Sequence, residues 1–401
     1  MKKSFLFILI AFLFLAGTSI AGAAPLAFQS SKPVSTFEGG SLYESGKLNI
    51  LDLHGTYKQM GRQYGYLLKD QLNHLYRIAI ENYFVGQKGL SRKTMEQTAM
   101  SLFDFYPQRF KEILYGMAET SGLSIDQHIV LNGLELYGTI SQCSGIASWK
   151  DYTAGGPLIF GRNYDWFDSY KEFANYLAIT VFNSDCGIPA AIVTFAGVIY
   201  ATTGMNAKGL FLELNNGMPS GGALSYSNRV PATINLLAFL CDCSTIEQLH
   251  AAFNTTRPNF TFIINTADKT GAYSYEWPPF DIKQRTGEVE GLLVATNHFT
   301  DPAWGIALQD NAGFKTVLRR KNLLLLGHKN KGRINLATMM EILDMPIDKG
   351  GATWPAGEKI QTVYQVIAIP EGLKLWVKVP GFQNWTGIDL APLFKSKDLP
   401  K

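Results

Sequence analysis

The sequence predicts an α+β protein built as a four-layer αββα sandwich, in which two antiparallel β-sheets are stacked and helices cover both outer faces. Three observations predict this class. The first third of the chain has helical hydrophobic periodicity, short strand-like runs begin abruptly at Cys143, and helices then alternate with strands. Short Gly- and Pro-containing breakers separate the strands, which indicates antiparallel links rather than parallel crossovers.

Length and composition are those of an ordinary globular protein. The chain has 401 residues, of which 46% are hydrophobic and 17% charged, enough for one large domain or two smaller ones around a sizeable core. Its formal net charge is +3, and the basic residues form no long run. We therefore expect no nucleic-acid partner and no binding to an acidic membrane surface.

The first residues have the pattern of a secretory signal peptide. Lys2 and Lys3 precede an apolar run over residues 5–15, and small residues follow, so we expect cleavage after Ala23. An uncleaved anchor is less favoured, because a spanning helix needs about 20 apolar residues. Residues 1–23 are therefore expected to be a signal peptide, and the mature protein to be secreted or periplasmic with no stable membrane span.

The cysteines and histidines show no metal-ligand spacing. The histidines are scattered singly along the chain, so we expect no structural zinc, no other metal and no cofactor. Export permits disulfide bonds, but a bridge between Cys241 and Cys243 would be strained. The sequence leaves open whether Cys186 pairs with Cys241 or with Cys243.

The first third of the chain is expected to be helical after a loosely held lead-in over residues 25–50. From Tyr57 to about Tyr83, apolar residues recur with i, i+3, i+4 spacing, which predicts an amphipathic helix. Further helices are expected from Ser91 to about Thr120 and from Ser124 to Tyr137.

Short strands and four helices are expected beyond Cys143, on the basis of apolar runs bounded by turn residues. The expected strands are Cys143–Trp149, Pro157–Arg162, Tyr176–Phe182, Ala190–Phe195, Gly209–Leu214, Thr261–Ala267, Ala272–Trp277, Gly291–Thr296, Thr362–Ile369 and Leu373–Lys378. The expected helices are Pro231–Cys241, Ser244–Phe253, Lys315–Leu326 and Leu336–Leu343, the second opened by a capping box of Ser244 and Glu247.

Cys143 is the first candidate for chemistry. A cysteine at the start of a strand is most often a small buried residue, but Arg162 and Asp165 close the next strand, across a Gly155-Gly156 hairpin. Such a hairpin folds the end of the second strand back beside the beginning of the first. A thiol, a guanidinium and a carboxylate can therefore converge.

These three groups suit acyl transfer. Arg162 would favour the thiolate of Cys143 and could hold a substrate acyl group. If Cys143 were the N-terminal residue, its α-amine, with a pKa of about 8, could take the thiol proton and later protonate the leaving amine. Asp165 would orient that amine. No histidine partner is then required, which disfavours a cysteine peptidase with a Cys/His pair.

Two strand ends could supply donors for a developing oxyanion. Asn297 follows the apolar run 291–295, and Asn215 and Asn216 follow the strand that ends near Leu214. An asparagine at a strand end is more often a turn former. The sequence alone therefore does not choose between these roles.

Four segments occur in the order seen in the linear amide C-N hydrolases, a clan of N-terminal-nucleophile (Ntn) hydrolases. They are Cys143-Ser144-Gly145, Gly161 to Trp166, Gly204 to Leu210 and Thr296-Asn297-His298. The clan holds the choloylglycine (bile salt and penicillin V) hydrolases, acid ceramidase and its acylethanolamine-hydrolysing relative, and the acyl-coenzyme A:6-aminopenicillanic acid acyltransferases. The acyltransferase-like branch is the most similar, because its pro-segment resembles Gly55-Thr56-Tyr57, Met60 to Gly65 and Gly122-Leu123-Ser124.

The resemblance covers about residues 50 to 380 and is carried by the order and spacing of these motifs. It implies an Ntn-hydrolase αββα sandwich in which residues 24–142 are a helical pro-segment, the later α chain, and residues 143–401 form the β chain. The precursor would cut itself between Gln142 and Cys143, and the two chains would stay associated. Whether the protein forms a homo-oligomer stays open.

Site residues follow from the same resemblance. It implies Cys143 as nucleophile, Arg162 and Asp165 as its partners, and Asn297 as an oxyanion donor. An ungapped match points to Asn216 as the second donor, with Glu213 as an alternative from ceramidase-like members and Asn215 beside them. Arg319 resembles a further site arginine carried by a helix, although Arg320 beside it weakens that assignment.

The favoured function is hydrolysis of a small-molecule linear amide through an S-acyl enzyme. The amide could be an N-acyl amino acid, an acylated lactone, a bile-salt-like amide or a β-lactam side-chain amide. An acyltransferase that uses a thioester donor is the second candidate, and coenzyme A is scarce outside the cytoplasm. A non-catalytic exported binding protein on the same fold is the third.

Overall fold

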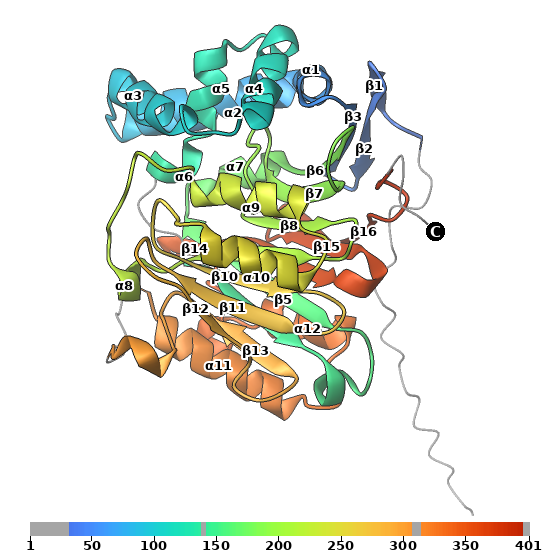
Figure 1. Ribbon diagram of the computed structural model, residues 1–401, viewed down its shortest axis with the longest axis vertical. Helices are drawn as coiled ribbons and strands as arrows, with labels where there is room; N and C mark the ends of the chain where they lie inside the picture. The colour runs from blue at the N-terminus through green and yellow to red at the C-terminus, as the bar shows by residue number, and fades with distance from the viewer. Residues whose placement is uncertain (1–31, 138–141, 307–313, 396–401) are drawn as a thin grey trace, which may run out of the picture.

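The computed structural model of the protein describes residues 32–137, 142–306 and 314–395. Two β-sheets lie face to face, and Figure 1 shows the N-terminal helices gathered at one end of the molecule and α11 (Thr316–Lys329) at the other. The expected α+β fold of stacked sheets covered by helices is confirmed. Among the described residues, no helix is both long and apolar enough to cross a bilayer.

The larger sheet has ten strands in the order β1-β2-β3-β6-β7-β8-β9-β10-β11-β12. Their bounds are Ser35–Phe37, Gly40–Ser45, Leu48–Gly55, Leu177–Ser184, Ala190–Phe195, Thr203–Asn206, Phe211–Asn216, Phe262–Ala267, Ala272–Trp277 and Lys283–Arg285. The smaller sheet has the order β13-β4-β5-β14-β15-β16. Its strands are Leu292–Ala295, Ser144–Ser148, Ile159–Phe167, Ile360–Ile369, Lys374–Val379 and Gln383–Asp389.

The N-terminal segment contributes strands as well as helices. A loose lead-in was expected over residues 25–50, and it is wrong from residue 35 onward, because β1, β2 and β3 lie between residues 35 and 55 and continue the larger sheet. β3 pairs with β6 in parallel, whereas the other neighbouring strands pair antiparallel. The buried Leu48, Ile50, Leu51 and Leu53 explain the result, because β3 is covered on both faces and lacks the polar alternation that marks a half-exposed strand.

The N-terminal helices are shorter than the hydrophobic pattern predicts. They are α1 (Tyr57–Leu67), α2 (Lys69–Leu75), a π-helix (Tyr76–Gln87), α3 (Arg92–Phe103), α4 (Gln108–Ser121), α5 (Ile125–Leu131) and α6 (Leu134–Tyr137). One helix was expected from Ser91 to Thr120, but Pro107 separates α3 from α4, because proline has no N–H and disfavours helical conformation in the residue before it.

Glycines allow α1 and α4 to pack at very short range. A Cβ on Gly61 would lie 2.1 Å from the Ile113 carbonyl oxygen, and one on Gly116 would lie 2.2 Å from the Lys58 carbonyl oxygen. Side chains at these positions would force the helices apart. The residues that resemble a family pro-segment therefore serve a packing role here.

The remaining helices cover the outer faces of the sheets. α9 (Ala232–Asp242) packs on β7 and β8, and α10 (Ile246–Thr255) lies against β11 through ring contacts; α7 (Tyr170–Phe173) and α8 (Met218–Gly221) are single turns. α11 and α12 (Leu336–Asp344) cover the smaller sheet. The expected capping box is displaced by one residue, since Thr245 caps α10 by accepting from the Gln248 N–H while Ser244 bonds the Gln248 side chain.

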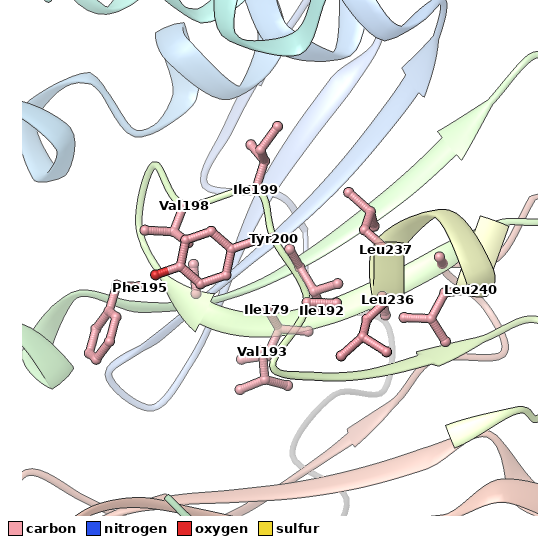
Figure 2. Close-up of a cluster of buried hydrophobic side chains, with 14 of the residues drawn as sticks. Ile179, Ile192, Val193, Phe195, Val198, Ile199, Tyr200, Leu236, Leu237 and Leu240 are labelled. Carbon is pink, nitrogen blue, oxygen red and sulfur yellow. The ribbon is translucent and has the colours of Figure 1, made fainter. Parts of the chain in front are cut away.

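Two apolar clusters hold the layers together. Figure 2 shows part of the larger one, in which side chains of β6, β7 and the following loop meet α9: Ile179, Ile192, Val193, Phe195, Val198, Ile199, Tyr200, Leu236, Leu237 and Leu240. The smaller cluster joins β4 and β13 to the outer helices through residues such as Ile146, Leu292, Leu323 and Met339. Such burial is worth about 25 cal/mol per Å² of apolar surface, and it fixes β4, which begins directly after Cys143.

Candidate active site

β4 and β5 place the thiol beside a buried arginine. Gly145 pairs with Arg162 and Ser144 with Asn163 in the antiparallel register, so the expected hairpin brings Cys143 next to the middle of β5 (Ile159–Phe167). The Arg162 Nη2 donates to the Cys143 sulfur at 3.4 Å, and both side chains are inaccessible to solvent. The predicted convergence of thiol and guanidinium is therefore found in the structure.

Arg162 also joins the two sheets. Its Nη2 donates to the Leu214 carbonyl oxygen at 2.9 Å, and its Nη1 donates to the Thr202 carbonyl oxygen and the Thr203 hydroxyl. Its Nε lies 3.3 Å from a Glu213 oxygen. This set of partners holds the cation between the sheets and fixes the position of the thiol.

Glu213, on β9 of the larger sheet, lies next to Arg162 and borders the site. Burial raises its pKa to about 7, against the opposing effect of Arg162, and its Oε1 accepts from Asn265 and, at 3.2 Å, from Asn215. A Cβ on Gly145 would lie 2.5 Å from that oxygen. Gly145 is therefore needed for the close approach of β4 to Glu213, and Asn215 supports Glu213.

Arg319 reaches the backbone on both sides of the Gln142–Cys143 bond. Its Nη1 donates to the Gln142 carbonyl oxygen at 2.8 Å and to the Cys143 carbonyl oxygen at 2.9 Å, and its Nη2 donates to the Asn297 Oδ1 at 2.7 Å. The side chain is fully buried. Its neighbour Arg320 instead pairs with Glu288 near the surface, so the structure distinguishes two arginines that the sequence did not.

Asp165 lies on the same side as Arg319. Its Oδ1 accepts from the Thr362 hydroxyl at 2.6 Å, its backbone carbonyl accepts from the Gln142 N–H at 2.9 Å, and its Oδ2 is 3.6 Å from the Arg319 Nη1. Burial raises the pKa of Asp165 to about 7, and Arg319 opposes this rise. Asp165 therefore bonds the backbone of Gln142, and its carboxyl group acts electrostatically on the Cys143 thiol.

The two predicted asparagines have different surroundings. The Asn297 Nδ2 donates to the Asn216 backbone carbonyl at 2.9 Å, so the ends of β13 and β9 meet. The Asn216 side-chain oxygen accepts from the Met218 N–H, which is the local turn role typical of asparagine. Asn297 therefore lies within the cluster around the Gln142–Cys143 bond, while the contacts of Asn216 hold the turn after β9.

The surroundings of the Cys143 thiol disfavour its ionisation. Burial raises the pKa of Cys143, an effect that Arg162 only partly offsets. Among the described residues, no hydrogen bond joins Cys143 to a histidine; His298 bonds Thr296 and Thr316, and burial lowers its pKa to about 3.

A cavity of about 250 Å³ adjoins the site. Its wall includes Leu214 and Asn216, whose carbonyls bind Arg162 and Asn297, and Trp166, which follows Asp165. The N-terminal helices line the opposite side with Leu102, Tyr106, Asn132, Glu135 and Leu136. The cavity therefore lies between the segment before Cys143 and the segment after it.

Sequence reasoning missed several residues of this site. Thr202, Thr203 and Thr362 carry no motif, and they hold Arg162 and Asp165 through contacts between strands far apart in the chain. Glu135 carried a weak signal as an acidic residue in an apolar helical stretch. All four cysteines are free thiols in the structure, so neither expected pairing of Cys186 is formed. Within the described ranges, no group of three or more His, Cys, Asp or Glu side chains could hold a metal ion.

Comparisons with known proteins test the family resemblance that the order of the motifs predicts. No family model matches the chain. The acyl-coenzyme A:6-aminopenicillanic-acid-acyltransferase 40 kDa form of Emericella nidulans is 23% identical over 254 residues, which cover 61% of this chain and 67% of the relative. The chain resembles the acyltransferase-like branch of the linear amide C-N hydrolases. The recognition made from the four motif segments is confirmed by this match.

Two further similarities are more limited. The protein dcd1B of Dictyostelium discoideum is 25% identical over 259 residues, which cover 56% of this chain but only half of the relative. A conjugated bile acid hydrolase from Clostridium perfringens superposes on 62% of this chain and 93% of its own, with 17% identity and a TM-score of 0.48.

Proposed function

We propose that the protein is an exported, self-processing N-terminal cysteine amidohydrolase that acts on linear amides through an S-acyl enzyme. One observation carries the proposal: the Arg319 Nη1 donates to the carbonyl of Gln142 at 2.8 Å, and the thiol of the next residue is held by Arg162. A cation on a carbonyl oxygen stabilises the negative charge that develops when a nucleophile attacks its carbon.

Self-cleavage follows from this arrangement. The Cys143 sulfur attacks the Gln142 carbonyl carbon, the C–N bond between the two residues breaks, and the thiol proton ends on the freed α-amine. Water then adds to the thioester, which releases the Gln142 carboxylate and restores the thiol. Asp165, beside Gln142 and buried, would pair with the new ammonium group.

Turnover of a substrate would use the same groups. The α-amine of Cys143 takes the thiol proton, the sulfur attacks the amide carbonyl carbon, and the ammonium group returns the proton to the leaving amine. Water then hydrolyses the S-acyl enzyme to the acid. Arg319 and Asn297, which bond each other at 2.7 Å, surround the position where the oxyanion forms.

The two chains would stay associated after cleavage. β3, from the segment before the cut, pairs with β6 along its length, and the buried side chains of α1 and β3 belong to the main apolar cluster. Residues 24–142 are therefore proposed as the α chain and residues 143–401 as the β chain of one folded unit. Export rests on the expected signal peptide over residues 1–23.

Acyl transfer is the second candidate, and a specific observation favours it. The Emericella nidulans relative is named as an acyltransferase, and an S-acyl enzyme passes its acyl group to an amine as readily as to water when the amine is bound nearby. The third candidate, an inactive binding protein, is disfavoured because Arg162, Asp165 and Asn297 surround Cys143 or the bond before it.

Intact-mass analysis tests the proposal. Wild-type protein expressed with its leader should give two fragments, one from Ala24 to Gln142 and one that begins at Cys143, while Cys143→Ala stays uncut at that bond. The matched control is Cys243→Ala, which should still cut. A single uncut wild-type chain that hydrolyses amides would contradict the proposal, and added amines that divert the product to new amides would favour acyl transfer.

A further inference from the structure

The cavity beside the active site has a wall from each proposed chain. Glu135 and Leu136 of α6 contribute one side, and Trp166, Leu214 and Phe262 contribute the other. The scissile bond has Gln142 on its acyl side, and the chain on that side leads back to α6 within seven residues. A substrate whose carbonyl replaced that of Gln142 would therefore direct its acyl group toward this cavity.

Size and composition of the cavity limit what it can bind. Its volume of about 250 Å³ is slightly below the range of roughly 300–1,000 Å³ found for drug-sized ligands. Five aromatic side chains line the wall, namely those of Tyr106, Trp166, Tyr200, Phe260 and Phe262. A compact, flat acyl group fits these limits, because aromatic rings pack well against one another.

Glu135 is the acidic residue of this wall. The Tyr164 hydroxyl donates to its Oε1 at 2.6 Å, and the Tyr164 ring lies 5.1 Å from the Arg162 guanidinium. Glu135 is partly exposed to the cavity, and its distance from bulk water raises its pKa to about 7. Glu135 thus lies in an apolar pocket and is connected to Arg162 through one tyrosine. A carboxyl group in such a place is unusual unless it binds a ligand.

One hydrogen-bond donor of the same wall has no acceptor of ordinary hydrogen-bond geometry within the described residues, namely the Tyr200 hydroxyl. The Trp166 indole N–H faces the Tyr170 hydroxyl instead. The Tyr200 side chain is 3% exposed. A buried donor without a partner costs free energy, so such a group usually binds a ligand or water. Together, Glu135 offers an acceptor and Tyr200 offers a donor.

We infer that this cavity is the acyl subsite and that it selects a compact aromatic acyl group ending in a hydroxyl, with Glu135 as the specificity-determining residue. The inference rests on the proposed amide hydrolysis. A hydroxyl both donates and accepts, so it satisfies the Glu135 carboxyl and the Tyr200 hydroxyl, whereas an ammonium group can only donate. A site built to bond a hydroxyl discriminates against the analogue that lacks it.

The test compares amides that share one leaving amine, 7-amino-4-methylcoumarin, and differ in the acyl group. The four acyl groups are phenylacetyl, 4-hydroxyphenylacetyl, 4-methoxyphenylacetyl and 4-(aminomethyl)phenylacetyl. Self-cleaved wild-type protein should show a kcat/KM about tenfold or more higher for the hydroxylated substrate than for phenylacetyl, the effect of one hydrogen bond to a charged group. The methoxy compound, which cannot donate, should not share this gain.

Variants of Glu135 and of a control glutamate show whether the substrate preference depends on Glu135 or on a general change in activity. Glu135→Leu should lose the preference, so that its kcat/KM for the hydroxylated substrate falls to the level of its kcat/KM for the phenylacetyl amide. Glu112→Gln, a glutamate of the neighbouring helix α4 outside the cavity, should keep the preference. If Glu135→Leu fails to fold or to cut itself, Glu135→Gln decides, because it keeps the shape and should still lower the preference.

Each contrary outcome has a distinct meaning. Hydrolysis of all four amides without preference, or a preference that survives in both Glu135 variants, would overturn the inference and leave the proposed function intact. A strong preference for the aminomethyl compound would overturn the hydroxyl assignment. Failure of wild-type protein both to cut itself and to hydrolyse any amide would overturn the proposed function and this inference with it.

Discussion

On the two faces of the smaller sheet, different charged residues contact the Gln142–Cys143 segment. On the inner face, Arg162 and Glu213 form a fully buried pair that holds the sulfur. On the outer face, Arg319 of α11 holds the carbonyl oxygens, with Asp165 at 3.6 Å. The sulfur and the carbonyl oxygens are therefore held by separate charged pairs, so mutations in one pair can be compared with mutations in the other.

The largest effect is expected on the inner face. Arg162→Met removes one partner of a buried ion pair and leaves Glu213 without its cation, which typically costs about 3–5 kcal/mol of stability. Urea unfolding of the variant in an uncut Cys143→Ala background measures this cost. The control is Lys150→Met, which breaks the exposed pair with Glu290 and should change stability by about 0–1 kcal/mol. Equal losses in both variants would remove the distinction between buried and exposed pairs.

On the outer face, the expected effect is kinetic. Arg319→Met removes the donor on the Gln142 carbonyl, so self-cleavage should slow by about 10²–10³-fold, the usual cost of one oxyanion donor. Electrophoresis of samples taken over time after synthesis gives the rate. Arg320→Met is the matched control, because this neighbour pairs with Glu288, and its cleavage rate should stay near that of wild type. A normal rate in Arg319→Met would show that the outer face does not act on the bond.

A smaller effect is expected where β4 approaches Glu213 of β9. Gly145→Ala would place a methyl group 2.5 Å from the Glu213 Oε1, and overpacking of this kind costs about 1–3 kcal/mol. Thermal unfolding measures the loss. Gly155→Ala is not a suitable control because its φ is positive. Ala147→Gly, two residues further along β4, is used instead, because it removes a methyl group where Gly145→Ala adds one. A Gly145→Ala protein as stable as wild type would mean that β4 and β9 can move apart.

The smallest effect concerns the pH dependence of stability at the cavity. Burial raises the pKa of Glu135 from 4.5 to about 7, so between these values the folded protein holds a proton that the unfolded chain has lost. The stabilising contribution is therefore complete below pH 4.5 and is lost as the pH rises through 7. Glu135→Gln should show a shallower fall of Tm between pH 5 and pH 7.5 than the parent. Parallel curves for the two proteins would place the carboxyl in ordinary solvent.

The sequence by itself determined the local features of this protein. Strands such as β7 and β11 have the predicted bounds, because their composition and flanking breakers act over a few residues. The approach of Arg162 to Cys143 was also predictable, since a hairpin between neighbouring strands fixes the register.

Only the tertiary structure decided the contacts between distant segments. Arg319 binds the carbonyl of Gln142 across 177 positions of the chain, and the strand β3 joins β6 across the whole helical segment. Glu135 meets Trp166 at a cavity that neither segment encloses alone. Hydrophobic burial is nondirectional, so a sequence pattern tells which face of a segment is covered but not which distant segment covers it.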